Sequence, residues 1–294
     1  MTIAAKVYRA CLCALTVLGI ASPATSWAQT SSYKLVEAGT LSVAITGDMP
    51  GLVAKDGKLV GYDGEILQIA ADNLKLKVKP VPMEWSGAIA AVQAGRIDVI
   101  GGNVAWTEQR GKTLAMTDPT AYFQNGVTQR KSTSWTKLSD LEGKRVGSIT
   151  GFSFVPELRK IKDIQLSLHD TSDAALRDLL AGRLDAMVGD PPVLNYAISQ
   201  NPTWNLQNIP FNDPHPEFPL LTGQGRQYVF GLAKDNQALS DAISGEIRKL
   251  WGMCDVKKIG TKYGQTNPAT FTPASANFRV GVDRPEGWTP PSCK

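Results

Sequence analysis

The fold is decided by Ala94-Gly95-Arg96-Ile97-Asp98-Val99-Ile100-Gly101-Gly102, a stretch that returns as Ala181-Gly182-Arg183-Leu184-Asp185-Ala186-Met187-Val188-Gly189. Each copy follows apolar residues at helical spacing and continues into a short apolar run. The glycine after the first alanine suits the left-handed residue just past a helix end, and the apolar run suits a parallel strand covered on both faces. A chance match is the alternative, but both copies share this context. They predict two similar α/β lobes.

Strand and helix patterns alternate on both sides of these copies. The strand predicted at 227–233 returns to the first lobe after the second lobe is complete, so the chain crosses between the lobes twice, near 122–125 and near 221–226. The expected parts are lobe 1 at 33–122 and 226–265, lobe 2 at 126–222, and an irregular tail at 266–294. Two crossings make a hinge, and a hinged cleft can close over a small ligand.

Residues 1–28 have the pattern of a cleaved signal peptide. Lys6 and Arg9 give a positive start, residues 10–20 form an apolar core too short to span a bilayer, and Ser26-Trp27-Ala28 offers small residues at the cleavage positions. The protein is therefore expected to be exported to the periplasm and released there.

The charge balance excludes nucleic acid as the expected partner. The full chain has 31 basic and 27 acidic residues, and the leader removes two basic residues and no acidic one, which leaves a net charge of +2. No basic run is interleaved with aromatic residues as nucleic-acid binding would require.

Two cysteines, Cys254 and Cys293, remain after the leader is removed. In an exported protein two cysteines usually pair, and a loop of about 40 residues would be stabilised by roughly 4 kcal/mol. We predict a disulfide that holds the tail, with two free thiols as the alternative. His169 and His215 stand alone, without the spacing of metal ligands, so neither a metal nor a cofactor is expected.

A family resemblance enters at Gly61-Tyr62-Asp63-Gly64-Glu65-Ile66, followed at helical spacing by Ala70 and Leu74. This run resembles the signature of the bacterial family 3 solute-binding proteins, the polar amino-acid receptors of ABC importers, although Gly64 stands where an aliphatic residue is usual. Further motifs follow in the family's order: Met83-Glu84-Trp85, Arg96-Ile97-Asp98-Val99, Thr107-Glu108-Gln109-Arg110, Thr117-Asp118-Pro119, Leu141-Glu142-Gly143-Lys144-Arg145-Val146-Gly147 and Val188-Gly189-Asp190. The resemblance covers about residues 41–263 and implies the type II periplasmic-binding-protein fold, with a cleft between the lobes.

The resemblance also implies roles for the residues that match its motifs. Arg110 matches the arginine that holds the ligand α-carboxylate, a task for which the guanidinium fork is suited. Asp190 matches the carboxylate that receives the α-ammonium from the opposite lobe, and Trp85 matches an aromatic wall. Bound between Arg110 and Asp190, a small zwitterionic solute would tie the lobes together.

Four further positions complete the implied pocket. Gly102 and Asn103 match positions of the first lobe that contact the ligand. Phe152 and Ser153 are expected at a helix start in the second lobe, where free N–H groups favour an anion.

Three positions near the pocket depart from the family pattern or stand at the pocket rim. Met49 stands where an aromatic lid residue is common, and a methionine covers an apolar group more adaptably. Ala105 replaces a common hydroxyl residue and so removes one hydrogen bond to the ligand carboxylate. Asp48 is expected at the rim.

The sequence thus predicts a monomeric receptor that docks on an ABC importer permease, and it leaves the solute open. Two alternatives remain. One is a periplasmic enzyme on the same fold, similar to the cyclohexadienyl dehydratases, although no acid and base are brought together by spacing. The other is a sensory or accessory binding protein that signals to a membrane partner.

Overall fold

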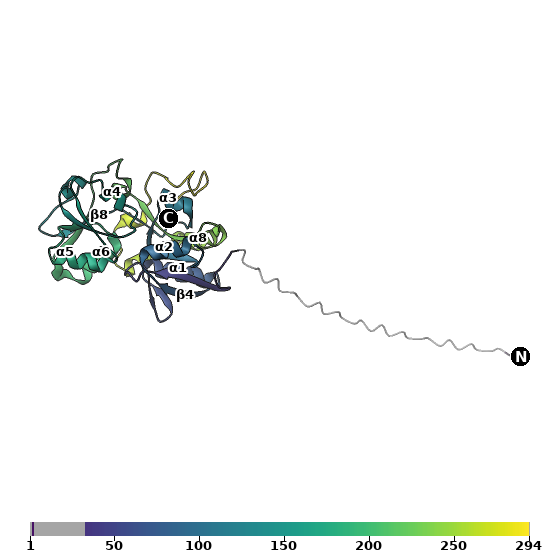
Figure 1. Cartoon of the computed structure of the whole chain (residues 1–294). Helices are drawn as coiled ribbons and strands as arrows, with labels where there is room; N and C mark the ends of the chain where they lie inside the picture. The colour runs from purple at the N-terminus through teal and green to yellow at the C-terminus, as the bar shows by residue number, and fades with distance from the viewer. Residues whose placement is uncertain (1, 3–32, 294) are drawn as a thin grey trace. The chain divides into compact units, whose positions relative to one another are not determined.

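Two β-sheets organise the chain in the computed structural model, which describes residue 2 and residues 33–293. The predicted signal peptide lies outside the described residues. None of the helices in residues 33–293 combines the length and the apolar composition that a membrane span requires. Each sheet is accompanied by helices, and the two groups are called lobe 1 and lobe 2 (Figure 1).

The sheet of lobe 1 has the strand order β4-β1-β5-β13-β6, and β7 also pairs with β13. Its strands are β1 (Thr40–Ile45), β4 (Lys77–Pro82), β5 (Val99–Ala105), β6 (Leu114–Met116), β7 (Ala121–Phe123) and β13 (Arg226–Ala233). Strands β4, β1 and β5 are parallel, whereas β13 runs antiparallel to β5, β6 and β7. The accompanying elements are the hairpin β2 (Val53–Lys55) and β3 (Lys58–Val60) and helices α1 (Tyr62–Asn73), α2 (Trp85–Gln93), α3 (Glu108–Thr113), α8 (Gln237–Gly252) and α9 (Asp255–Lys262).

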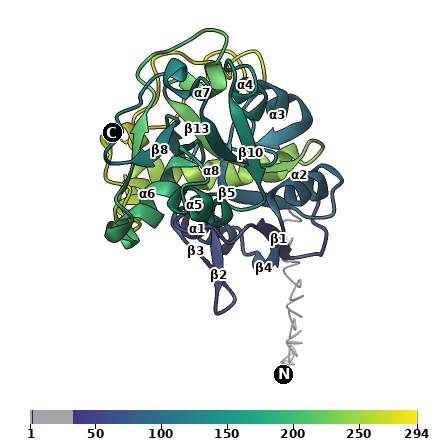
Figure 2. The same cartoon turned by 60° about the vertical axis from the view of Figure 1, so that its left-hand side comes forward.

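The sheet of lobe 2 has the order β10-β9-β11-β8-β12. Its strands are β8 (Gly126–Arg130), β9 (Arg145–Ile149), β10 (Gln165–His169), β11 (Ala186–Met187) and β12 (Leu206–Pro210). Its helices are α4 (Val155–Leu158), α5 (Ser172–Leu180), α6 (Pro191–Gln200) and α7 (Pro219–Thr222), with 3-10 turns η1 (Leu138–Leu141) and η2 (Pro202–Trp204). Figure 2, turned by 60° from the view of Figure 1, shows α5 and α6 of lobe 2.

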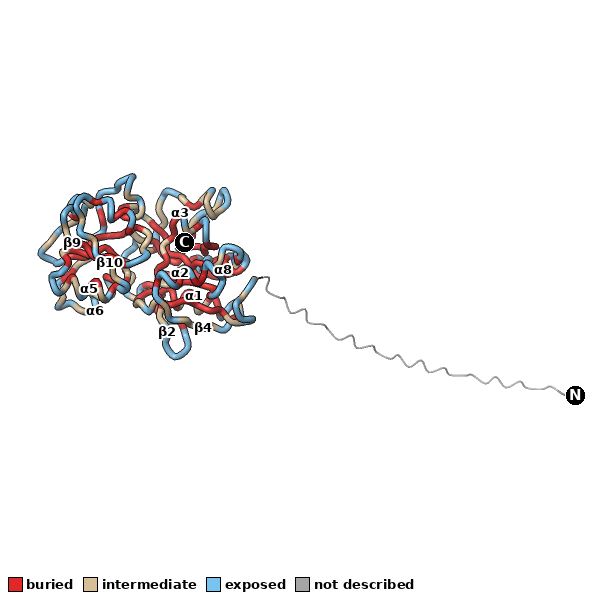
Figure 3. The backbone as a smooth tube through the Cα atoms, in the orientation of Figure 1, coloured by how far each residue is buried: buried red, intermediate tan, exposed pale blue. Residues whose placement is uncertain are grey.

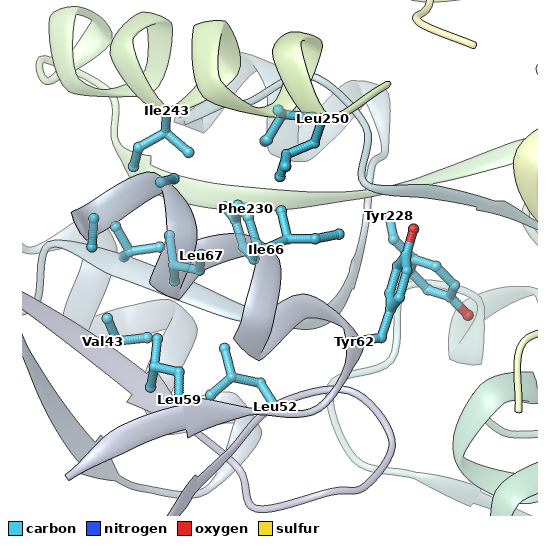
Figure 4. Close-up of a cluster of buried hydrophobic side chains, with 14 of the residues drawn as sticks. Val43, Leu52, Leu59, Tyr62, Ile66, Leu67, Tyr228, Phe230, Ile243 and Leu250 are labelled. Carbon is cyan, nitrogen blue, oxygen red and sulfur yellow. The ribbon is translucent and has the colours of Figure 1, made fainter. Parts of the chain in front are cut away.

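Both faces of the lobe 1 sheet are buried, as the apolar run at Val99 predicted. Val43 and Val99 pack with α1 and α8 in one hydrophobic cluster, whereas their neighbours Ala44 and Ile100 pack with α2 in another. Figure 3 shows this burial along the strands, and Figure 4 shows the first cluster between α1 and α8. A strand with neighbours on both faces needs apolar residues at successive positions, which is why its sequence lacks strict alternation.

The repeated stretch has the same structural role in both lobes, which confirms the prediction drawn from it. Gly95 and Gly182 adopt left-handed conformations, with φ of 65° and 75°. Asp98 accepts a hydrogen bond from the N–H of Ser42 on β1, at 2.8 Å. Asp185 likewise accepts one from the N–H of Arg145 at the start of β9, at 2.9 Å. In each lobe the aspartate therefore fixes the start of the neighbouring parallel strand.

The two crossings between the lobes are confirmed by the sheet membership of the strands. Strand β7 of lobe 1 is followed directly by β8 of lobe 2, and β13 returns to the sheet of lobe 1 after α7. The residue boundaries of the two lobes stay a prediction.

The described part of the predicted irregular tail has one short 3-10 turn, η3 (Pro268–Phe271), and is anchored to the rest of the chain at Arg279. The side chain of Arg279 is fully buried, donates to the carbonyl of Thr117 at 2.9 Å and pairs with Asp283. Arg284 pairs with Asp118 beside it, at 3.2 Å. The tail is therefore fastened to lobe 1 beside the first crossing.

Cys254 and Cys293 are free thiols in the structure, although they lie side by side. Burial raises the pKa of the Cys293 thiol to about 11, and a hydrogen bond with Cys254 adds to this shift. The predicted disulfide is therefore not formed in the structure. The tail is instead held by the contacts of Arg279 and Arg284, and a disulfide in the exported protein stays a prediction.

We expect Arg279→Ala to lower the free energy of unfolding by about 3 kcal/mol, because it leaves the buried Asp283 with only the more distant Arg284, at 3.9 Å, and the indole N–H of Trp106. The matched control is Arg177→Ala, since Arg177 and Asp173 form a pair of the same spacing whose side chains are 64% and 68% exposed, against 0% and 4% for Arg279 and Asp283. This control should lose less than about 1 kcal/mol in urea denaturation. If both variants lost the same free energy of unfolding, the contacts of Arg279 would not fasten the tail to lobe 1.

Candidate ligand-binding site

The site begins in the middle of β5, at the residues where the first copy of the repeated stretch ends. Gly102 and Asn103 have positive φ, at 87° and 61°. Buried Asp63 holds this bend, since its carboxylate accepts from the N–H of Asn103 and from the hydroxyl of Thr120, both at 2.7 Å. Burial raises the pKa of Asp63 to about 6. Asp63 belongs to the signature run at 61–66, so this run fixes the backbone of the site at Asn103.

Arg110 lies in α3, whose first turn is capped by the hydroxyl of Thr107. Its Nη1 donates to the carbonyl of Ala105 at 2.8 Å, and its guanidinium lies 5.4 Å from the centre of the Trp85 ring. Burial lowers the pKa of Arg110 to about 10, helped by the nearby charge of Arg226. No ion pair among the described residues includes Arg110. A guanidinium has five N–H donors, so several are left for a ligand carboxylate.

Asp190 lies in lobe 2, immediately before α6. Its carboxylate accepts a hydrogen bond from the hydroxyl of Tyr228 in lobe 1. Burial raises the pKa of Asp190 to about 7, and the side chains of Tyr228 and Asn103 only partly oppose that shift. Asp190 therefore connects the lobes and changes its charge near neutral pH.

The aromatic wall predicted at Trp85 is also where the lobes meet. The indole N–H of Trp85 donates to the carbonyl of Gly151 in lobe 2 at 3.3 Å, and the ring packs edge-on against Phe152 with centroids 6.1 Å apart. Trp85 is 9% exposed. The cleft is therefore narrow at this position.

Two small spaces lie on either side of this contact, and they differ in charge. The first, the basic space, has a volume of about 30 Å³ and is lined by Arg110, Arg226, Ala105 and Ser153. The second, the acidic space, has a volume of about 40 Å³, and its charged lining residues are Asp48, Glu84, Asp170 and Asp190. Trp85, Asn103, Phe152 and Asp190 line both spaces. The cleft thus offers cations at one end and carboxylates at the other.

The structure brings most of the predicted site residues together at these two spaces. Gly102 and Asp48 line the acidic space, and burial raises the pKa of Asp48. Ala105 lines the basic space and orients Arg110 through its carbonyl. Met49 is not among the residues that line either space.

The expected helix start at Phe152 and Ser153 is wrong. Helix α4 begins only at Val155, has four residues, and the N–H of Phe152 already donates to the carbonyl of Ile149 at 3.2 Å. Gly151 adopts φ of 83°, so a glycine turn separates β9 from the helix. Phe152 and Ser153 line the cleft as part of this turn, and the N–H of Phe152 is not free to bind an anion.

Arg226 is the functional candidate that the sequence analysis missed. It opens β13 at the second crossing, is 6% exposed, and lies 4.8 Å from the centre of the Phe123 ring. Its Nη1 donates to the carbonyl of Leu220 at 2.6 Å, and its Nη2 lies 3.4 Å from the hydroxyl of Ser153. The available signal was a basic residue at the start of an otherwise apolar strand. Tyr228, two residues further on, was missed because it fits the strand pattern equally well.

These features define a class of protein, a two-lobe receptor whose ligand site lies between the lobes at the ends of their parallel strands. The comparisons identify the family. The profile of the bacterial extracellular solute-binding proteins, family 3, matches residues 41–266, and the chain belongs to this family. It is a solute-binding receptor, and its fold is that of the type II periplasmic binding proteins.

Similar proteins support this assignment. The probable amino-acid-binding protein YxeM of Bacillus subtilis is 29% identical over 76% of this chain and 83% of its own length. The L-cystine-binding protein TcyJ of Escherichia coli is 30% identical over 53% of this chain and 61% of its own. A solved ancestral arginine-binding protein with bound arginine is 28% identical with a TM-score of 0.66, covering 76% of this chain and 98% of that one.

The pKa of Asp190 predicts how stability depends on pH. An aspartate with a folded-state pKa of about 7 and an ordinary pKa of 3.8 holds its proton more tightly in the folded chain. Stability from this group is therefore present at pH 4 and is lost as the pH rises through about 7. We expect Asp190→Asn to flatten the fall in the free energy of unfolding between pH 5 and pH 8.

The control is Asp178→Asn, because Arg183 lowers the pKa of Asp178 and places its titration below this window. Denaturation in urea across the pH range measures both variants. If Asp190→Asn keeps the wild-type slope, the carboxyl is not buried as the structure has it.

Proposed function

We propose that the protein captures an amino acid between Arg110 and Asp190 and delivers it to an ABC importer permease. It would work as a monomer in the periplasm after its leader is cleaved. The observation that carries this proposal is the half-buried Arg110 guanidinium, which lines the cleft with no carboxylate partner within the described residues. A buried unpaired cation is costly, and a ligand carboxylate relieves that cost when it binds.

The amino acid would be held by both lobes. Its carboxylate would lie in the basic space between Arg110 and Arg226, where the second guanidinium replaces the hydrogen bond lost at Ala105. Its ammonium would pair with Asp190 and lower the pKa of that carboxyl, so binding would strengthen as the pH rises through about 7. Because the partners belong to different lobes, the ligand favours the closed cleft over the open one.

The acidic space suggests the kind of amino acid. Asp48, Glu84 and Asp170 line it without a basic side chain, and a cationic side chain would meet attraction there. The ancestral relative was solved with arginine bound, and histidine-binding periplasmic proteins of Escherichia coli and Salmonella typhimurium are 26% identical. We therefore propose a basic amino acid as the cargo.

The proposal assigns no catalytic step. The pKa of Asp190 is raised to about 7, as a general acid would need, but the proposal gives its carboxylate to the ligand ammonium and the hydroxyl of Tyr228. The proteins named among its relatives are binding proteins. Delivery is favoured over a purely sensory role because the family serves importers, and an adjacent permease gene would support it.

We test the proposal with the mature protein, stripped of co-purified ligand by unfolding and refolding. Isothermal titration with arginine, lysine, histidine, cystine, glutamine and glutamate should show tightest binding for a basic amino acid. Arg110→Ala should weaken that binding by about 2–5 kcal/mol, because the ligand carboxylate is left buried and unpaired. Arg226→Gln should weaken it less, since Arg110 remains.

The control variant is Arg96→Ala, an exposed arginine in the turn after α2, which should bind as the wild type does. Wild-type affinity in Arg110→Ala would refute the site. Tightest binding of glutamate would refute the proposed cargo while leaving the site in place.

A further inference from the structure

A second and much larger cavity lies beside the hinge, outside the proposed amino-acid site. It has a volume of about 800 Å³, within the range of roughly 300–1,000 Å³ that is typical of small-molecule pockets. We call it the hinge groove. Tyr62 and Tyr122 line it from lobe 1, Asn195 and Tyr196 line it from α6 in lobe 2, and residues 263–276 contribute a third wall.

Most of the third wall lies outside the range that the family profile matches. The family profile ends at residue 266, so the wall residues from Asn267 to Ala276 lie beyond it. They are held in place by the tail contacts of Arg279 with the carbonyls of Met116 and Thr117. The third wall of the groove is thus anchored to lobe 1.

The composition of the lining excludes a charged ligand. No Asp, Glu, Lys, Arg or His side chain is among the residues that line the groove. Transferring an ion from water into such a lining would cost free energy without a compensating charge. The groove therefore suits a neutral ligand, in contrast to the cleft with its two charged ends.

Aromatic rings and amides dominate the lining instead. Two partly exposed tyrosines, Tyr196 and Tyr263, line the groove, whereas Tyr62 and Tyr228, which Figure 4 shows at the edge of the lobe 1 core, are 3% and 2% exposed and form its floor. The side chains of Asn195, Gln224 and Gln265 make no hydrogen bond within the described residues, and each amide can donate and accept. Flat apolar faces beside free amides match a sugar ring, which has C–H faces and a rim of hydroxyls that both donate and accept.

We propose that the hinge groove binds a neutral polyhydroxy compound, a small saccharide or polyol. Its ring would stack on Tyr196 or Tyr263, the two partly exposed tyrosines of the lining, and its hydroxyls would bond to the free amides.

The two sites share part of their walls. Tyr228 and Asn103 line both the hinge groove and the basic space, and Tyr228 donates a hydrogen bond to Asp190. A groove ligand therefore shifts the affinity for the cleft ligand, and the cleft ligand shifts the groove affinity by the same factor.

The test is isothermal titration of the mature wild type with glucose, trehalose, maltose and myo-inositol, with gluconate and glucosamine as charged counterparts. At least one neutral probe should bind and both charged counterparts should bind more weakly. Tyr196→Ala should weaken the neutral probe about tenfold or more, as loss of a central aromatic contact does. Gln200→Ala, an exposed position of the same helix outside the lining, should leave it unchanged.

Arg110→Ala distinguishes the two sites, because it should weaken amino-acid binding as predicted above and leave the affinity for the neutral probe unaffected. Absence of binding by every neutral probe, equal binding of gluconate, or loss of the probe in Arg110→Ala would each overturn the proposal. If the affinity for the amino acid stayed the same at a saturating concentration of the neutral probe, the proposed effect of one ligand on the binding of the other would be overturned. Since the amino-acid titration is run on the same samples, failure of one proposal is seen separately from failure of the other.

Discussion

The buried carboxylate of Asp63 is the constraint on which the binding site depends. It receives the N–H of Asn103 and the hydroxyl of Thr120, and so joins the start of α1 to the end of β5 and to the segment before β7. A fully buried carboxylate is tolerated only where its hydrogen bonds are satisfied, so these partners cannot move independently. The left-handed conformation of Gly102 and Asn103 is the result, and it places Asn103 against Asp190 across the cleft.

The cleft holds basic groups at one end and acidic groups at the other, and their burial costs the unliganded protein free energy. Arg110 and Arg226 have lowered pKa values and Asp48 and Asp190 have raised ones, all chiefly because they are buried. Each shift records a charge that would be more stable in water. A zwitterion supplies partners for both signs at once, which explains how a small molecule could hold the lobes closed. The hinge groove, which has no such charges, would act on the same hinge by stacking and neutral hydrogen bonds.

Much of the architecture was predictable because it depends on local patterns. The repeated glycine, aspartate and apolar run specifies a helix end, a strand start and a buried strand, and all three occur in both lobes, although β11 has only two residues. Arg110 and Asp190 could be placed because they fall within family motifs. The helix start at Phe152 was wrong because the glycine turn at Gly151 takes up these residues before α4 begins.

Other features depend on contacts between distant residues and left no local signal. Arg226 approaches Ser153 only because β13 returns from the second lobe beside the turn that follows β9. The proline-rich tail predicted an irregular segment, which is correct, but its sequence does not show that Arg279 would be buried against carbonyls of lobe 1. The hinge groove likewise exists only where α6, the crossings and the tail meet.

The most direct test of the central claim compares two buried aspartates of lobe 1. Asp63 holds the bend at the site, whereas Asp98 accepts the N–H groups of Val36 and Ser42 at the opposite end of β5. Asp63→Asn and Asp98→Asn should each lower the free energy of unfolding by about 1–3 kcal/mol, because each removes an acceptor from buried donors. In isothermal titration with the amino-acid ligand, only Asp63→Asn should lose affinity, by about tenfold or more. Wild-type affinity in Asp63→Asn, with the same loss of stability in both variants, would show that the site does not depend on this carboxylate.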